Sequence, residues 1–409
     1  MIKRIVTALK EKGIKRIVAE AVRKKRTERF GRYISEVVSS CPLKQDVIDF
    51  QSRPDYSDNG KALSEYMERN GFFSKYKVYW LVEDIEACKE SFPDTKVEFV
   101  QMYDKHGVYT KEALDIYLTA QYVIATHVFY VPKYQSNPLQ KRFLLWHGCG
   151  YKDKGWTKFI PNNFDKVCVS GPLFIETKMK YWNINKGIII DKGYPRYDWL
   201  LHPSDRARSF AQSMRNGKGK MIVWMPTYRN AVGFKENVIS RFPILSSEED
   251  WKALDKHCAE QGVSLILKLH IYQKEYNIDF GSMSSIRLLS YDDLRNAGVN
   301  LYEFLPLTDG LISDYSSVAI DYLLADKPIA FALDDYDLYK SSRGFVFDNP
   351  LDYMPGSKLY GVADLLRFID DCALGNDPFK HDRDGLRKIA VHESDNYSGE
   401  ILEALGLFC

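Results

Sequence analysis

Apolar runs of strand length, alternating with helix-like stretches, constrain the fold of this chain more than any other feature of its sequence. Continuous apolar strands between helices are typical of parallel sheets that are buried on both faces. A break between about residues 191 and 220 divides these runs into two sets, and 409 residues are too many for one ordinary core. The clearest runs are KVYWLVE, KVEFV, QYVIATH, RFLLWHG, DKVCVSG and GIIIDKG in the first set, and MIVWMPT, SLILKLH, IRLLS, GLISDYS and PIAFALD in the second.

The sequence therefore predicts an α/β protein with two Rossmann-like domains facing a cleft. We place the first domain at residues 33–195 and the second at 196–409, with a separate basic segment at 1–32. The final stretch, GEILEALGLFC, is expected to form a helix that packs back on the first domain.

The composition excludes several classes of protein. Apolar residues make up 45% of the chain and aromatic residues 14%, which argues against disorder. The sequence holds no apolar stretch near the roughly 18 residues that a membrane-spanning helix needs, and its start lacks a signal-peptide core. Its seven scattered cysteines include no C-x-x-C, which indicates neither a disulfide framework nor a zinc site and favours a reducing cytosol.

Residues 1–32 concentrate positive charge on an amphipathic pattern. Twelve Lys or Arg against three Glu give this segment a net charge of +9, while the whole chain carries only +2. Such a helix can lie in a membrane interface, where each basic residue near anionic lipid adds roughly 1 kcal/mol. A surface helix docked on its own protein is the alternative. A nucleic-acid arm is disfavoured, because no aromatic stacking residues are interleaved with the charges.

Polar side chains follow four of the apolar runs at the point where each run ends. Ligands of open α/β sheets bind at the carboxyl ends of the strands, so these positions predict a ligand site. The residues are His147 after RFLLW, Thr227 and Arg229 after MIVWMP, His270 after SLILKL, and Ser313, Asp314, Ser316 and Ser317 after GLI.

The segment SDYSSVAIDYLLADKP is suited to binding a phosphate. Ser316 or Ser317 can cap a helix there, and free N–H groups at a helix start favour an anion. Asp321 would lie about one turn into this helix and accept a ribose hydroxyl. Simple capping of a βα unit is the alternative, but it accounts for one serine only.

Two further strand ends add candidates for the same site. His270 can hydrogen-bond a diphosphate and stabilise charge on a leaving group, although a structural histidine is the default for this signal alone. Thr227 and Arg229 offer a hydroxyl and a guanidinium suited to phosphate, although Pro-Thr after a strand is also ordinary turn chemistry.

His147 is the first residue of a loop that contains several glycines. Gly148 and Gly150 let the backbone approach a ligand closely, and Lys152 can meet a phosphate. A histidine is suited to taking a proton from an alcohol near neutral pH. From these residues alone, a catalytic base and a core histidine are equally good interpretations of His147.

The sequence shows no pair of carboxylates between a strand and a loop that would require a divalent ion. Asp334, Asp335 and Asp337 are close in sequence, but a solvated loop is the simpler interpretation. We therefore expect no metal and no other cofactor.

In these motifs the chain resembles the CDP-glycerol:poly(glycerophosphate) glycerophosphotransferases, the teichoic-acid and capsule enzymes with a two-domain GT-B fold. The family's loop W-H-G-T-P-L-K-x-x-G stands here as WHGCGYKDKG, with Cys149 to Tyr151 replacing Thr-Pro-Leu. Other similar segments are RPDYSDNGKALSEYM, GYPRYDWL, MPTYR, KLHI and SDYSSVAIDYLLADKPIAF, so the resemblance covers roughly residues 47–360.

The resemblance implies roles for individual residues. His147 would be the base that deprotonates the acceptor hydroxyl, with Gly148 and Lys152 in an acceptor loop. His270 would bind the donor diphosphate and help CMP leave. The donor-binding group would comprise Thr227, Arg229, Ser313, Asp314, Ser316, Ser317 and Asp321, which makes residues 33–195 the acceptor domain and 196–409 the donor domain.

The predicted function is transfer of glycerol phosphate, or a related polyol phosphate, from a CDP-alcohol to a hydroxyl of a lipid-linked or growing cell-surface glycan. The expected partners are CDP-glycerol or CDP-ribitol, that acceptor and an anionic membrane surface, at the cytoplasmic face of the membrane. No nucleic acid is expected. A GT-B glycosyltransferase or epimerase that uses a nucleotide sugar, and a non-enzymatic scaffold, are the alternatives. Glycerol or ribitol, and primase or polymerase, stay open.

Overall fold

The computed structural model describes residues 25, 32–33, 36–127, 137–152, 164–227, 242–269 and 279–409. The chain divides into two compact units. The first unit comprises Met1–His147, Phe159–Val167 and Leu405–Cys409, and the second comprises Gly148–Lys158 and Cys168–Ala404. Most of the predicted basic helix over residues 1–32, and the candidates Arg229 and His270, lie outside the described residues. The domain boundary at residues 195 and 196 stays a prediction.

The first sheet has the strand order β3-β2-β1-β4-β5-β6-β7, and its pairings from β3 to β6 are parallel. Its strands are β1 (Lys44–Gln51), β2 (Lys77–Val82), β3 (Glu98–Gln101), β4 (Ala120–Ala125), β5 (Lys141–Leu144), β6 (Lys166–Cys168) and β7 (Ile189–Ile190).

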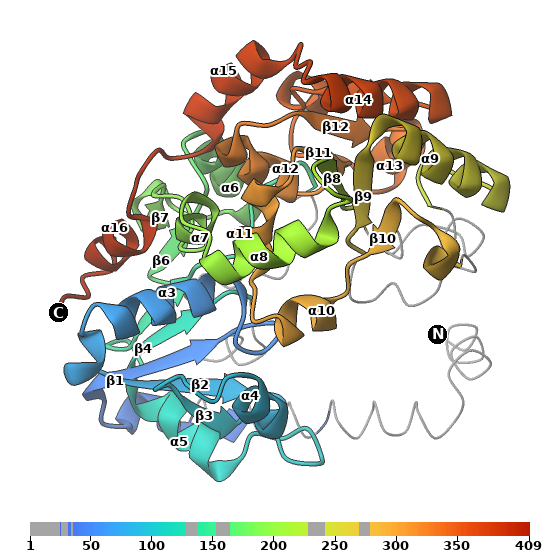
Figure 1. The fold of residues 1–409 in the computed structure, drawn as a ribbon. Coiled ribbons are helices and arrows are strands. Elements are labelled where there is room, and N and C mark those ends of the chain that lie inside the picture. Colours follow the sequence, from blue (N-terminus) through green and yellow to red (C-terminus); the bar gives the residue numbers. More distant parts are fainter. Residues whose placement is uncertain are drawn as a thin grey trace, which may run out of the picture. The chain divides into compact units, whose positions relative to one another are not determined.

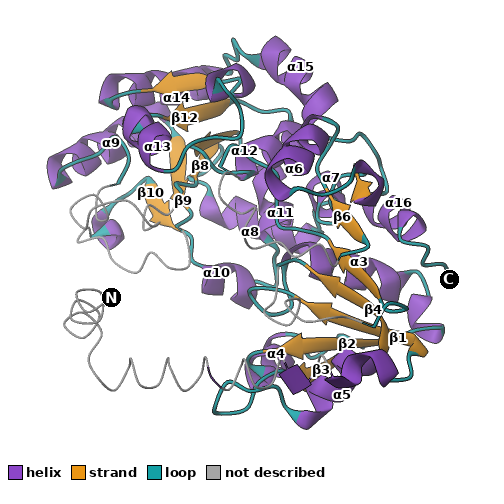
Figure 2. Cartoon of the chain, turned by 180° about the vertical axis from the view of Figure 1, so that it is seen from behind, coloured by secondary structure: helices purple, strands orange, loops and turns teal. Residues whose placement is uncertain are grey.

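Helices cover both faces of β1 and its neighbours, which explains why most of the buried residues of these strands are apolar. In both ribbon views α3 (Asp58–Arg69) lies on one side of these strands and α5 (Lys111–Thr119) on the other (Figures 1 and 2). Under α3, the Trp80 ring stacks on Phe50 with ring centroids 5.3 Å apart. The helix α4 (Ile85–Ser91) begins at Asp84, whose side chain accepts a hydrogen bond from the Ala87 N–H.

The second sheet has the order β10-β9-β8-β11-β12-β13, with parallel pairing throughout. The predicted α/β class with two parallel sheets is therefore confirmed. The strands are β8 (Lys220–Trp224), β9 (Val263–Leu267), β10 (Ile286–Leu288), β11 (Gly310–Ser313), β12 (Ile329–Ala332) and β13 (Ser357–Leu359). The helices of the second unit are α6 (Leu173–Trp182), α7 (Tyr197–Leu201), α8 (Asp205–Met214), α9 (Glu248–Gln261), α10 (Tyr291–Asn296), α11 (Leu301–Phe304), α12 (Val318–Asp321), α13 (Tyr336–Ser342), α14 (Val362–Leu374), α15 (Lys380–Ala390) and α16 (Tyr397–Ala404).

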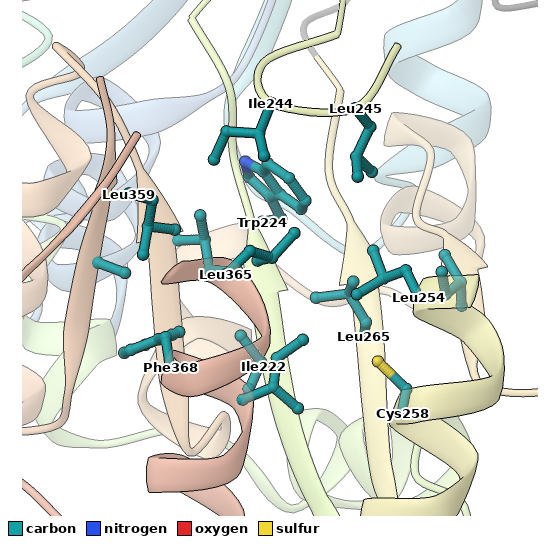
Figure 3. Close-up of a cluster of buried hydrophobic side chains, with 14 of the residues drawn as sticks. Ile222, Trp224, Ile244, Leu245, Leu254, Cys258, Leu265, Leu359, Leu365 and Phe368 are labelled. Atoms are coloured by element: carbon teal, nitrogen blue, oxygen red, sulfur yellow. The ribbon is translucent and has the colours of Figure 1, made fainter. Parts of the chain in front are cut away.

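The core of the second unit lies where α9 and α14 pack on this sheet. Figure 3 shows Leu254 from α9 and Phe368 from α14 converging on Ile222 and Trp224 of β8 and Leu265 of β9. The four strand and α9 residues are at most 2% exposed, so their apolar area is almost completely removed from water.

The strand register aligns the carboxyl ends of the strands within each sheet. In the second sheet Trp224 pairs with both Leu267 and Ile312, and in the first sheet Ala125 pairs with Leu144. The residues that follow these strands therefore come to the same edge of their sheet. Within the described ranges, no helix is both long enough and apolar enough to cross a bilayer.

Candidate functional site

Thr227, Asp314 and Lys152 form a hydrogen-bonded chain in the second unit. β8 and β11 are neighbours, so the residues that follow them meet, and the Met225 N–H donates to the Ile312 carbonyl at 2.8 Å. Asp314 accepts from the Thr227 N–H at 2.7 Å and also from the Thr227 hydroxyl. The Lys152 ammonium donates to the same hydroxyl oxygen at 3.2 Å. The structure thus joins Lys152 of the predicted acceptor loop to two of the predicted donor-binding residues.

The serines after β11 are arranged differently from the predicted helix cap. Ser317 stands at the N-cap position of α12, as predicted, but its side chain makes no capping hydrogen bond there among the described residues. Because α12 has only four residues, its dipole gives little support to an anion. Ser316 is half-buried, and the buried hydroxyl of Ser313 has no hydrogen-bond partner in the described part of the chain.

Asp321, predicted to accept a ribose hydroxyl, accepts hydrogen bonds from three protein side chains. They are the Arg196 guanidinium at 2.6 Å, the Tyr197 hydroxyl at 2.5 Å and the Tyr302 hydroxyl at 2.7 Å. Burial and the negative charge of Asp321 raise the pKa of Tyr197, so this hydroxyl stays protonated and can donate. The ribose contact stays a prediction.

The glycines of the predicted acceptor loop lie directly against Ser317. Gly148 has φ +132°, and a Cβ added to it would stand 2.5 Å from the Ser317 hydroxyl oxygen. A Cβ on Gly150 would stand 3.0 Å from the Ser317 Cα. Both positions therefore need glycine, because the backbone of the loop takes the space of a side chain.

The residues that replace Thr-Pro-Leu in this loop are buried and hydrogen-bonded within the second unit. The Cys149 sulfur lies 3.1 Å from the Tyr194 hydroxyl, and the Tyr151 hydroxyl donates to the Tyr353 carbonyl at 2.8 Å. Cys149 and Tyr151 therefore anchor the loop within the second unit.

His147 belongs to the first unit, where it follows β5. Its Nδ1 lies 3.3 Å from the carbonyl oxygen of Thr126, the residue after β4. A carbonyl can only accept, so this hydrogen bond requires a proton on Nδ1 and puts the lone pair of the neutral ring on Nε2. The Nε2 atom would then be the basic one. Trp146, which precedes it, has φ +61° and its carbonyl accepts from the buried Asn59 side chain at 2.8 Å.

The sequence reasoning missed His127, which stacks on His147. The two ring centroids lie 4.3 Å apart with an interplanar angle of 7°, and the His127 Nδ1 lies 2.9 Å from the Thr126 hydroxyl. Thr126 thus contacts both rings, one through its carbonyl and one through its hydroxyl. The signal was present, because His127 also ends an apolar run. The reasoning missed Arg196 as well, although it stands in the GYPRYDWL segment.

The residues considered for a metal have other partners. Asp334 accepts from the Ile244 N–H at 3.1 Å, and Asp335 accepts from the Tyr315 hydroxyl at 2.9 Å. Asp337 is exposed but lies in the first turn of α13, so the expected solvated loop is not what the structure shows. Within the described ranges, no three His, Cys, Asp or Glu residues are grouped as metal ligands would be. The expectation of no metal stays a prediction.

Comparisons with known proteins identify the relatives of this chain. An alignment over 76% of the chain is 24% identical to the teichoic acid poly(glycerol phosphate) polymerase of Bacillus subtilis (strain 168), of which it covers 42%. Another over 77% of the chain is 23% identical to the teichoic acid glycerol-phosphate primase of the same organism and covers 81% of it.

A solved structure of the wall teichoic acid polymerase TagF shares the fold. Its TM-score is 0.72 at 18% identity, with 99% of this chain and 98% of that chain covered. The predicted two-domain fold class is confirmed by this likeness. A model of one family matches residues 33–402, nearly the whole described structure, and so the chain belongs to the CDP-glycerol:poly(glycerophosphate) glycerophosphotransferase family.

Proposed function

We propose that this chain transfers glycerol phosphate, or a related polyol phosphate, from a CDP-alcohol to a hydroxyl of a lipid-linked or growing cell-surface glycan, as in teichoic acid or capsule synthesis. The acceptor oxygen bonds to the β-phosphorus of the donor. The bond from that phosphorus to the bridging oxygen breaks, CMP leaves with its electron pair, and a base takes the acceptor proton. Family membership supports this reaction class.

One observation carries the donor side of the proposal: Lys152 reaches the Thr227 hydroxyl at 3.2 Å, and Asp314 accepts from that hydroxyl. The Thr227 hydroxyl gives its one proton to Asp314 and so acts by holding the Lys152 ammonium. An ammonium has three N–H donors, which suits it to a diphosphate oxygen as well. The Ser317 hydroxyl lies beside Gly148 of the same loop and adds a further donor. Arg229 and His270, which lie outside the described residues, are the other proposed donor contacts.

The acceptor side rests on His147. The contact between its Nδ1 and the Thr126 carbonyl favours the tautomer in which Nε2 accepts a proton. The Thr126 carbonyl thus orients the ring, in the way that a base needs a third group to fix its position.

Titration calorimetry with CDP-glycerol, CDP-ribitol and UDP-sugars tests the donor class. We expect a CDP-alcohol to bind and Thr227→Val to weaken binding by about tenfold, since the hydrogen bond that holds the Lys152 ammonium is lost. Thr308→Val is the matched control, because its hydroxyl is buried in the same unit and bonds to Leu305 and Tyr322. Binding of UDP-sugars alone would favour a glycosyltransferase, and donor binding without CMP release would favour a scaffold.

We propose further that the protein works peripherally at the cytoplasmic face of the membrane, where a lipid-linked acceptor would be found. The net charge of +9 on residues 1–32 supports attraction to anionic lipid. Sedimentation with vesicles that contain phosphatidylglycerol should capture the full chain and not a variant that lacks these residues. Vesicles of phosphatidylcholine alone are the control, and equal capture of both proteins would refute the proposal.

A further inference from the structure

Arg196 and Asp321 form an ion pair inside the second unit, although 125 residues separate them in sequence. The nitrogen–oxygen distance is 2.6 Å, and the two side chains are 2% and 0% exposed. Such a buried pair usually adds little net stability, because both charges lose their hydration. Its presence is better explained by what it holds in place.

Arg196 is fixed on several sides. Asp321 is itself held by the hydroxyls of Tyr197 and Tyr302. The centre of the guanidinium lies 4.2 Å from the Tyr302 ring and 5.2 Å from the Tyr194 ring, both within the range of cation–π contacts. A planar group bonded at its edge and stacked on its faces has little freedom to move.

The fixed guanidinium lies against the glycine loop. A Cβ on Gly148 would stand 3.1 Å from an Arg196 Nη2 and 2.5 Å from the Ser317 hydroxyl oxygen. Tyr194, which stacks on Arg196, also contacts Cys149 of the loop at 3.1 Å. The loop from Gly148 to Gly150 therefore packs against Arg196, Tyr194 and Ser317 together.

We propose that Arg196 is a positioning residue for the transfer reaction. Held by Asp321 and Tyr302, it sets the loop against Ser317 and thereby fixes where Ser317 and Lys152 meet the donor diphosphate. This inference rests on the proposed function. A lysine would keep the charge but lacks the planar guanidinium with its several N–H groups. It could therefore not bond to Asp321 and support the loop at the same time.

Arg196→Lys and a matched control separate positioning from stability. Arg383 is also 2% exposed, and it donates to Asp377 at 2.7 Å from α15. We measure the thermal midpoint and the Kd for CDP-glycerol and CDP-ribitol. Arg196→Lys should raise the Kd about tenfold, the loss of one charged hydrogen bond. Arg383→Lys should lower the midpoint and leave the Kd unchanged.

A second pair of variants keeps the test decisive if Arg196→Lys does not fold. Tyr302→Phe removes one hydrogen bond to Asp321 and keeps the ring, so it should raise the Kd by a smaller factor. Tyr322→Phe, which removes a buried hydroxyl 2.7 Å from Thr308, should not change it. If each site variant matches its control, the inference is refuted. If the wild type binds neither CDP-alcohol, the proposed function has failed instead.

Discussion

Replacing Asp49 by asparagine should change how the stability of the protein depends on pH. Asp49 lies on β1, an interior strand of the first sheet between β2 and β4, and is completely buried. Its Oδ2 accepts from the Gln51 amide at 2.6 Å, and its Oδ1 has no hydrogen-bond partner among the described residues. Burial raises the pKa of Asp49 to about 7, against the lowering effects of the Gln51 hydrogen bond and the Arg142 charge.

The sign of the effect follows from the two pKa values. Between the ordinary value of 3.8 and about 7, the folded chain keeps a proton that the unfolded chain has lost. The free energy of unfolding therefore falls as the pH rises through this window, by about 1.4 kcal/mol per pH unit. Over the whole window the loss amounts to roughly 4 kcal/mol, and it is complete at pH 8.

Asp49→Asn stays neutral at every pH, so it should lose this pH dependence. Its new amide N–H group would lack a partner, which costs about 1–3 kcal/mol, so we expect a net gain of roughly 1–3 kcal/mol over the wild type at pH 8. Urea unfolding at pH 5 and pH 8 measures both quantities. Asp115→Asn, which removes an exposed carboxylate 3.4 Å from Lys44, controls for the change in net charge. An equal loss of stability between the two pH values in wild type and Asp49→Asn would refute the reasoning.

Three further predictions concern the core, the histidine pair and the metal. Leu254→Ala should lower the free energy of unfolding by about 2–5 kcal/mol, whereas Leu374→Ala, at a residue 74% exposed, should change it little; similar urea midpoints would contradict this. His127→Ala should lower kcat by roughly two- to tenfold through loss of ring stacking on His147, and His127→Phe should recover most of it. We also expect CMP release to persist in a chelator, and loss of activity that magnesium restores would argue for a metal.

The strands that the sequence revealed are those with apolar residues on both faces. β11 lies inside the run GLISDYS, and β8 and β9 match the runs MIVWMPT and SLILKLH except at their first residues. Thr227 and Asp314, which follow β8 and β11, meet as the register requires. β1 was not among the clearest runs, because Asp49 and Gln51 are polar although buried. A pattern read from hydrophobicity cannot find a central strand that buries a carboxyl group. β13 was missed for another reason, since Ser357 and Lys358 are polar and half-buried and only Leu359 is buried.

The candidate site was predictable to the level of segments and not of contacts. Spacing along the chain suggested that Asp321 accepts a hydrogen bond from a ligand, whereas in the structure Arg196, Tyr197 and Tyr302 donate to it. None of these pairings has a period or a fixed spacing, because the residues meet only once α7, α11 and α12 pack together. Sequence reasoning could find His147 and Lys152, which lie on one loop, but not the support of that loop.

The ion pair also limits what the removal of either charge alone can reveal. GYPRYDWL contributes Arg196 and SDYSSVAIDYLL contributes Asp321, so the two segments form one buried unit. Removing Asp321 alone leaves a buried guanidinium without its counter-charge, and the resulting loss would be severe whatever the role of Asp321 in binding. Only the coupling between the two positions, measured as a double-mutant cycle on donor affinity, separates the cost of an orphaned charge from a loss of donor contacts. If Asp321 acts through Arg196, the double variant should bind the donor no more weakly than the Arg196 variant alone.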